Sequence, residues 1–208
     1  HDLREMTAGR QAPDKGRAYF ADLFARCTHM MNAVQALPQP VIPQVHGIAT
    51  AAGCQLVASC DLAIASDDCR FGVNGVNIGL FCSTPMVALS RNIPRKHAFE
   101  MLTTGKFIDA DRAKSLGLVN DVVPHDQLDI ATQELAETIA AKLGAAVKIG
   151  KEAFYQQIQM PVDEAYDYAG DVMVQNMLYR DTEGKLQQLM EETVDGERRG
   201  YHKPIMLA

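Results

Sequence analysis

The chain of 208 residues has no dense run of basic residues and no apolar stretch near the roughly 18 residues that a membrane-spanning helix needs. Its 26 Asp and Glu outnumber its 20 Lys and Arg, so the formal net charge is −6. This charge argues against nucleic acid as a partner and against a polybasic membrane anchor. The composition, 47% apolar and 22% charged, is ordinary for a globular domain and excludes low-complexity disorder.

Other signatures are also missing. The cysteines are odd in number, 5, and have no CxxC spacing, which argues against a disulfide framework and against a zinc site. We expect reduced, mostly buried thiols in a cytosol-like compartment. The 6 histidines lack metal-ligand spacing, and there is neither a GxSxG nucleophile motif nor a phosphate-binding GxxxxGK[ST] loop. The chain opens on His1 rather than Met, so we expect a longer natural protein.

Hydrophobic periodicity predicts short strands and helices in the first half of the chain. A polar, loop-like segment is expected over residues 1–15. Strands are predicted over residues 41–45, 61–65 and 118–123, and an irregular loop over 71–83. Helices are predicted over residues 16–37, 51–59, 84–91, 95–103 and 110–116, the last capped by Asp109.

The second half reads as helix. The expected helices there cover residues 127–143, 146–158, 163–178 and 182–193. We predict an α/β core over residues 1–125 and a helical C-terminal region of the same domain over 126–208.

The most informative segment is residues 45–56, V-H-G-I-A-T-A-A-G-C-Q-L. A strand, a turn and a helix start built from Gly and Ala let backbone N–H groups approach a ligand, and the helix N-terminus adds the positive end of its dipole. This arrangement suits an oxyanion hole. The alternative is close helix–strand packing that needs small residues.

Further segments extend this pattern with fixed order and spacing: residues 40–42, 47–49, 52–56, 60–65, 71–79, 101–105, 108–113 and 117–124. Together they resemble the enoyl-CoA hydratase/isomerase (crotonase) family. Within the family, the run Gly-Val-Asn-Ile-Gly-Leu-Phe-Cys-Ser-Thr-Pro over residues 75–85 is most similar to one branch. Members of the family carry additional strands before the position at which this chain begins.

The resemblance implies a crotonase-like spiral ββα core that binds an acyl-CoA thioester, needs no other cofactor and assembles as a homotrimer or homohexamer. It implies two backbone N–H groups that hold the thioester oxygen; residue-by-residue matching assigns them to His1 and Ala52. The backbone of Asp2 and Leu3 would line the adenine pocket, and Arg4 would lie close to the CoA phosphates. The implied location is the cytoplasm, or the mitochondrial matrix in a eukaryote.

Departures from the family pattern affect the expected reaction. The two glutamates that activate water in the family's hydratases correspond to Gln55 and Gly75. A glutamine amide orients water but does not accept its proton at neutral pH, and glycine does neither. We therefore do not expect hydration by the two-glutamate route, although glutamates restored at both positions should raise it. Asn77 is a remaining polar candidate.

Two functions stay open. One is an enzyme whose oxyanion hole supports an enolate-forming reaction that needs no strong protein base, such as decarboxylation. The other is a non-catalytic or regulatory acyl-CoA-binding protein.

The helical second half carries apolar residues that predict self-association, with packing inside one chain as the alternative. They include Leu135, Ile139, Phe154, Tyr166, Val172, Met173, Met177, Leu186 and Leu189.

Overall fold

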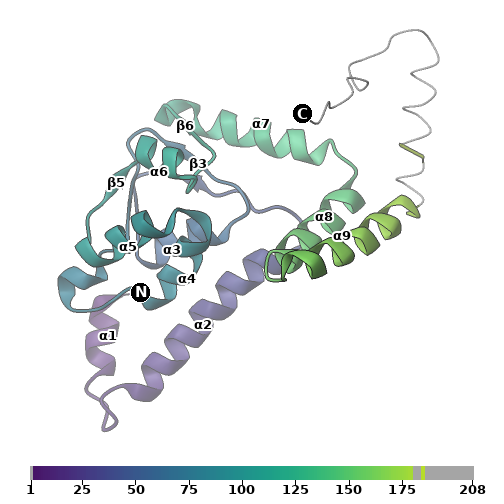
Figure 1. Ribbon diagram of the computed structural model, residues 1–208. Coiled ribbons are helices and arrows are strands. Elements are labelled where there is room, and N and C mark those ends of the chain that lie inside the picture. The colour runs from purple at the N-terminus through teal and green to yellow at the C-terminus, as the bar shows by residue number, and fades with distance from the viewer. Residues whose placement is uncertain (1, 180–183, 186–208) are drawn as a thin grey trace. The chain divides into compact units, whose positions relative to one another are not determined.

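The chain folds into two compact units, His1–Ile139 and Ala140–Ala208. The computed structural model describes residues 2–179, 184 and 185, which are coloured in Figure 1. In the described part of the chain, no helix combines the length and the apolar character that crossing a membrane requires.

The first sheet of the first unit is wholly parallel. It contains β1 (Gln44–Val45), β3 (Ile64–Ser66) and β6 (Asp121–Val123), in the order β1-β3-β6. Strand β3 is buried at every position, as expected for the central strand of a parallel sheet.

The second sheet is mixed. Strand β4 (Arg70–Gly72) lies between β2 (Ile48–Thr50), to which it is parallel, and β5 (Ile108–Asp109), to which it is antiparallel.

The chain passes from one sheet to the other in a spiral. Strands β1 and β3 belong to the first sheet, and the strands that follow them, β2 and β4, belong to the second. Helix α3 (Ala52–Ser59) follows the first of these pairs, and the 3-10 turn η1 (Asn74–Ile78) and α4 (Ser83–Asn92) follow the second. Each pair with its helix is one ββα turn.

Each unit contains further helices. In the first unit they are α1 (Leu3–Gly9), α2 (Arg17–Ala36), α5 (Arg95–Thr104), α6 (Ala110–Leu116) and α7 (Leu128–Ala140), with the 3-10 turn η2 (His125–Gln127) before α7. The second unit contains α8 (Gly144–Gln157) and α9 (Val162–Met177), which pack against each other.

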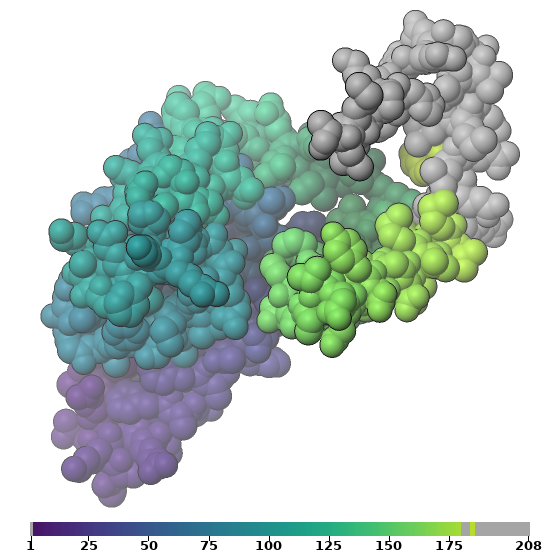
Figure 2. Space-filling view, viewed as in Figure 1, coloured from purple at the N-terminus to yellow at the C-terminus, as the bar shows by residue number. Residues whose placement is uncertain are grey.

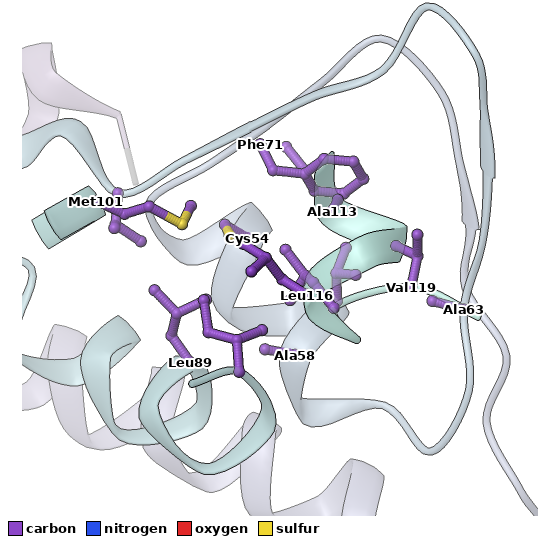
Figure 3. Packing of buried hydrophobic residues seen from close by; sticks show 14 of the residues in the cluster. Cys54, Ala58, Ala63, Phe71, Leu89, Met101, Ala113, Leu116 and Val119 are labelled. Carbon is purple, nitrogen blue, oxygen red and sulfur yellow. The ribbon is translucent and has the colours of Figure 1, made fainter. Parts of the chain in front are cut away.

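Helix α3 lies in the hydrophobic core of the first unit. Figure 3 shows Cys54 and Ala58 of this helix among Phe71 of β4, Leu89 of α4 and Met101 of α5, all of them buried. Five of the eight residues of α3 are buried, and it contacts both α2 and α4. Burial of these side chains fixes the helix in place, and therefore also its first residue, Ala52.

Most predicted helices are confirmed, with ends shifted by a few residues. The cap of α6 is confirmed as well, because Asp109 Oδ1 accepts a hydrogen bond from the Arg112 N–H group at 2.8 Å. Of the helix predicted over 182–193, all but residues 184 and 185 lie outside the described residues. Four of the five cysteines are buried, as predicted, and none of the five forms a disulfide.

The prediction of a loop over residues 1–15 is wrong, because α1 occupies Leu3–Gly9. The Asp2 carboxylate begins this helix by accepting a hydrogen bond from the Arg4 N–H group at 2.7 Å. Helix α1 buries none of its residues, so it has no apolar stripe for periodicity to detect.

The predicted strands are too long, and β2, β4 and β5 were not predicted. Side-chain hydrogen bonds supplement the backbone ones next to β1 and β3: the Val41 N–H group donates to the Asp61 carboxylate at 2.6 Å, and the Ala63 N–H group donates to Asn120 Oδ1 at 2.7 Å. The predicted loop over 71–83 contains the end of β4, η1 and the first residue of α4. Strands of two or three residues are too short to show the alternation on which the prediction relied.

Candidate functional site

The turn between β2 and α3 holds a backbone conformation that is rare for alanine. Ala51 has φ 47° and ψ −112°, and the only other non-glycine residue with positive φ in the described chain is Lys15. The Ala51 N–H group donates to the Gly72 carbonyl oxygen at 2.9 Å, and the Ala51 carbonyl oxygen accepts from the Gln55 N–H group at 2.9 Å. Such strain costs about 1–3 kcal/mol and is concentrated at functional sites.

The strained turn leaves the N–H group of Ala52 free. Ala52 is the first residue of α3, and its N–H group makes no hydrogen bond to any residue that the structure describes. The neighbouring Gly53 faces open space, since a Cβ atom added there would meet nothing within 4 Å. Close packing therefore does not explain the glycine. The first turn of α3 presents a free donor at the positive end of the helix dipole.

The Gln55 side chain, one turn after Ala52 in α3, carries a hydrogen-bond acceptor without a partner among the described residues. The residue is only 6% exposed, and its side-chain Oε1 has no hydrogen-bond partner in the described structure. A buried amide oxygen without a partner costs about 1–3 kcal/mol. A ligand or a water molecule that donates to Oε1 would recover this energy.

The loop that carries Gly75 is joined to the same turn. The Thr50 hydroxyl donates to Asn74 Oδ1 at 2.7 Å, which connects the end of β2 to η1. The Gly75 N–H group donates to Cys82 Sγ at 3.3 Å, and its carbonyl oxygen accepts from the Leu80 N–H group at 2.9 Å. The loop therefore folds back over Gly75.

No space is available for a side chain at position 75. A Cβ atom added to Gly75 would overlap the Leu80 carbonyl oxygen and lie 2.9 Å from Cys82 Sγ. The φ angle of Gly75 is not in the left-handed region, so the obstacle is steric. This revises the expectation that a glutamate at position 75 would raise hydratase activity.

The other polar side chains of the loop make local contacts. The Asn77 side-chain amide donates to the Gly105 carbonyl oxygen at 3.4 Å, and its atoms fill the space beside that glycine. The Ser83 hydroxyl donates to the Phe81 carbonyl oxygen at 3.4 Å. Together with the Thr50–Asn74 bond, these contacts stabilise the loop, and a role for Asn77 toward substrate stays a prediction.

The residues predicted to bind CoA lie at the start of the chain. His1 lies outside the described residues. Asp2 caps α1, while Leu3 and Arg4 form its exposed first turn. Helix α1 contacts α2, and α2 contacts α3. The role of residues 1–4 in binding the substrate stays a prediction.

The cysteine next to the free donor is not a reactive thiol. Burial raises the pKa of Cys54 to about 12, although a hydrogen bond from the backbone of Gly72 acts in the opposite direction. Its thiol therefore stays protonated and uncharged at neutral pH. Within the described residues, no three His, Cys, Asp or Glu side chains are grouped so that they could hold a metal ion.

The spiral of ββα turns and the free N–H group at the start of α3 define a class of protein. The family model of enoyl-CoA hydratase/isomerase matches residues 1–194, so the chain belongs to this family. The crystal structure of an enoyl-CoA hydratase from Mycobacterium smegmatis is similar, with 54% sequence identity and a TM-score of 0.87 over 92% of this chain and 73% of that chain. The crotonase fold predicted from the sequence is confirmed.

Within this family, the chain is similar to the proteins named enoyl-CoA hydratase domain-containing protein 3, mitochondrial, which is the predicted branch. It is 45% identical to the Xenopus laevis protein over 192 residues, which are 92% of this chain and 64% of that protein. It is 46% identical to the Homo sapiens protein over 181 residues, or 87% and 58% of the two chains. The crystal structure of the human protein has 43% identity and a TM-score of 0.86 over 92% of this chain and 74% of that chain. The chain thus spans less than two thirds of these two curated relatives.

Sequence reasoning missed two residues of this site. Ala51 holds the strained turn, but nothing marks an alanine for positive φ, which L-residues other than glycine rarely adopt. Cys82 fills the space beside Gly75 although seven positions separate the two residues, and no motif predicts that contact.

We predict that Gly75→Ala lowers the free energy of unfolding by about 1–3 kcal/mol, because the added methyl group overpacks the loop. Gly53→Ala is the matched control; it adds the same methyl group to a helical position with open space and should change stability by less than about 1 kcal/mol, toward higher stability. Urea denaturation of both variants measures the difference. Equal stability of the two variants would contradict the steric argument.

Proposed function

We propose that this chain binds an acyl-CoA thioester and that the Ala52 N–H group stabilises the negative charge that develops on the thioester oxygen. The free N–H group of Ala52 carries this proposal. A preorganised donor at a helix N-terminus stabilises an oxyanion strongly, since it needs no reorganisation when the charge appears. The His1 N–H group is the second donor in this proposal, and Asp2, Leu3 and Arg4 contact the CoA part.

Gln55 supports the proposal as a polar group with an unused acceptor. Its unpaired Oε1 is one turn from Ala52 along α3 and can accept a hydrogen bond from substrate or from an ordered water molecule. Because an amide does not act as a base at neutral pH, Gln55 orients a group rather than removing its proton.

The chemistry that fits this site forms an enolate without a protein base. Decarboxylation meets this condition: the bond between the α-carbon and the carboxyl group breaks, CO₂ leaves, and the electron pair is delocalised onto the thioester oxygen at the Ala52 N–H group. A proton from water then completes the product. No further cofactor enters this proposal, and a mitochondrial matrix location is proposed for a eukaryotic source, as for the relatives named mitochondrial.

One observation favours the second function, a non-catalytic acyl-CoA-binding protein. The position of the second glutamate is a glycine, and the Leu80 carbonyl oxygen and Cys82 occupy the space that its side chain would need. A pocket that binds the thioester while lacking any base would serve binding or regulation.

Substitutions at Ala52 test the site. Butyryl-CoA, which has no carboxyl group to lose, should bind to Ala52→Gly within about twofold of the unchanged protein, because the N–H group is retained. Ala52→Val should weaken binding about tenfold or more, because the larger side chain obstructs the thioester. Isothermal titration calorimetry measures the affinities, with Ala18→Val as the matched control on the exposed part of α2. Unchanged binding by Ala52→Val would reject this position of the oxyanion hole.

Hydration of crotonyl-CoA tests the loss of the glutamates. The unmodified protein should bind crotonyl-CoA yet hydrate it at a background rate, since general-base catalysis, worth about 10²–10⁴-fold, is missing. Mass spectrometry, which detects the addition of water to the enoyl thioester, follows the reaction. Rapid hydration would show that another residue acts as the base. Turnover of a panel of carboxyacyl-CoA thioesters then separates the two functions, because a binding protein would turn over none of them.

The second unit supports a proposal of self-association. Large apolar side chains are exposed along α8 and α9: Phe154, Ile158, Val162, Tyr166, Met173, Val174 and Met177. Figure 2 shows one face of these two helices, in green. Of the apolar residues predicted to form an interface, Leu135, Ile139 and Val172 are partly buried, and Leu186 and Leu189 lie outside the described residues. Exposed apolar surface of this extent marks an interaction site.

We therefore expect a homotrimer or homohexamer in sedimentation velocity at micromolar concentration. Tyr166→Asp with Met173→Asp should shift the population toward monomer, because a carboxylate at a buried interface is costly to desolvate. Gln156→Asp, on an exposed position of α8, is the control. A monomer in the unmodified protein would contradict the proposal.

A further inference from the structure

A cleft of the first unit lies between α5, strand β5 and helix α6. Its volume is about 240 Å³, below the roughly 300–1,000 Å³ typical of pockets for drug-sized ligands. None of residues 51–55 or 74–78 lines it, so it is distinct from the candidate thioester site.

Two cations without acidic partners face this cleft. Lys106 and Arg112 both line it, and neither forms a salt bridge with any residue in the described part of the chain. The Arg112 guanidinium contacts only the ring of His97, with Nη2 at 3.3 Å from Nδ1 and 3.4 Å from Nε2. A guanidinium group has five N–H donors, so most of them remain available to a ligand.

The single carboxylate of the lining does not neutralise these cations. Glu100 Oε2 lies 3.7 Å from His97 Nδ1, on the α5 side of the cleft. With one carboxylate against Lys106 and Arg112, these three side chains together carry one excess positive charge. This charge suits a monoanion.

The floor of the cleft is apolar. It is formed by the buried side chains of Met101 and Leu116 and by the half-buried Phe107. The Phe107 ring is held in place, because it packs on Gly72, where a Cβ atom would lie 2.8 Å from the ring, and because the Arg70 guanidinium lies 5.3 Å from the ring centroid. A flat apolar body can pack against this floor while an anionic end reaches the two cations.

We propose that this cleft binds a small organic monoanion with an apolar body, such as an aromatic carboxylate. The carboxylate contacts Arg112, whose fork of N–H donors matches its two oxygens, and Lys106 supplies a second positive charge. The apolar body packs against Met101, Phe107 and Leu116. This site does not depend on acyl-CoA binding and would operate in addition to it.

The test is an amide NMR titration of the ¹⁵N-labelled chain with benzoate. We expect saturable shifts concentrated in residues 97–116. Benzamide, which has the same ring without the charge, and acetate, which has the charge without the ring, should each bind at least about tenfold more weakly. Shifts scattered over the chain would overturn the proposal. Equal affinities for benzoate and acetate would overturn it too, because they would show nonspecific attraction between charges.

Variants assign the binding to the two cations. Arg112→Gln and Lys106→Gln should each weaken benzoate binding about tenfold, the usual effect of losing a hydrogen bond to a charged group. Lys96→Gln is the matched control: this residue is exposed, lies next to His97 in α5 and does not line the cleft, so its loss should leave the affinity unchanged. Equal weakening by all three variants would overturn the proposal, because it would reflect net charge alone.

Discussion

The hydrogen bond from the Ala51 N–H group to the Gly72 carbonyl oxygen joins the two ββα turns on which the candidate site is built. It holds the end of β2 against the end of β4, and it fixes Ala51 in a conformation that alanine rarely adopts. The buried face of α3 prevents the turn from relaxing, because relaxation would move Cys54 and Ala58 out of the core. The free donor of Ala52 is therefore maintained by packing that lies several residues away from it.

A hydrogen bond between the end of β2 and the loop after β4 also restricts the space at position 75. The loop after β4 is tied to β2 through Thr50 and Asn74 and folds back so that Cys82 and the Leu80 carbonyl oxygen enclose Gly75. In this chain the loop thus encloses Gly75, and a single substitution at that position does not open it. If the Ala52 N–H group is the oxyanion donor that we propose, the absence of a carboxylate at positions 55 and 75 favours reactions in which the substrate supplies its own electron pair.

Phe107 connects the candidate thioester site with the cleft that contains Lys106 and Arg112. One side of its ring packs on Gly72, whose carbonyl oxygen holds the Ala51 turn, while the residue itself lines the cleft that contains Lys106 and Arg112. Glycine at position 72 is required for this contact, because any side chain there would displace the ring. Strand β4 therefore contributes to both places. The Gly72 carbonyl oxygen holds the Ala51 turn of the candidate thioester site, and Gly72 also packs against the Phe107 ring that lines the cleft.

The sequence by itself determined the family, the longer helices and the cap at Asp109. Each of these depends on a local pattern: a repeat of apolar residues, a capping residue at fixed spacing, or a run of residues matched position by position. Tertiary structure alone decided the short strands, the strain at Ala51, the enclosure of Gly75 by Cys82 and the grouping of Lys106 with Arg112. These features depend on how the chain folds back on itself, at Gly75 and Cys82 over only seven positions, or on a backbone conformation that the residue type does not favour. Neither leaves a periodic trace in the sequence.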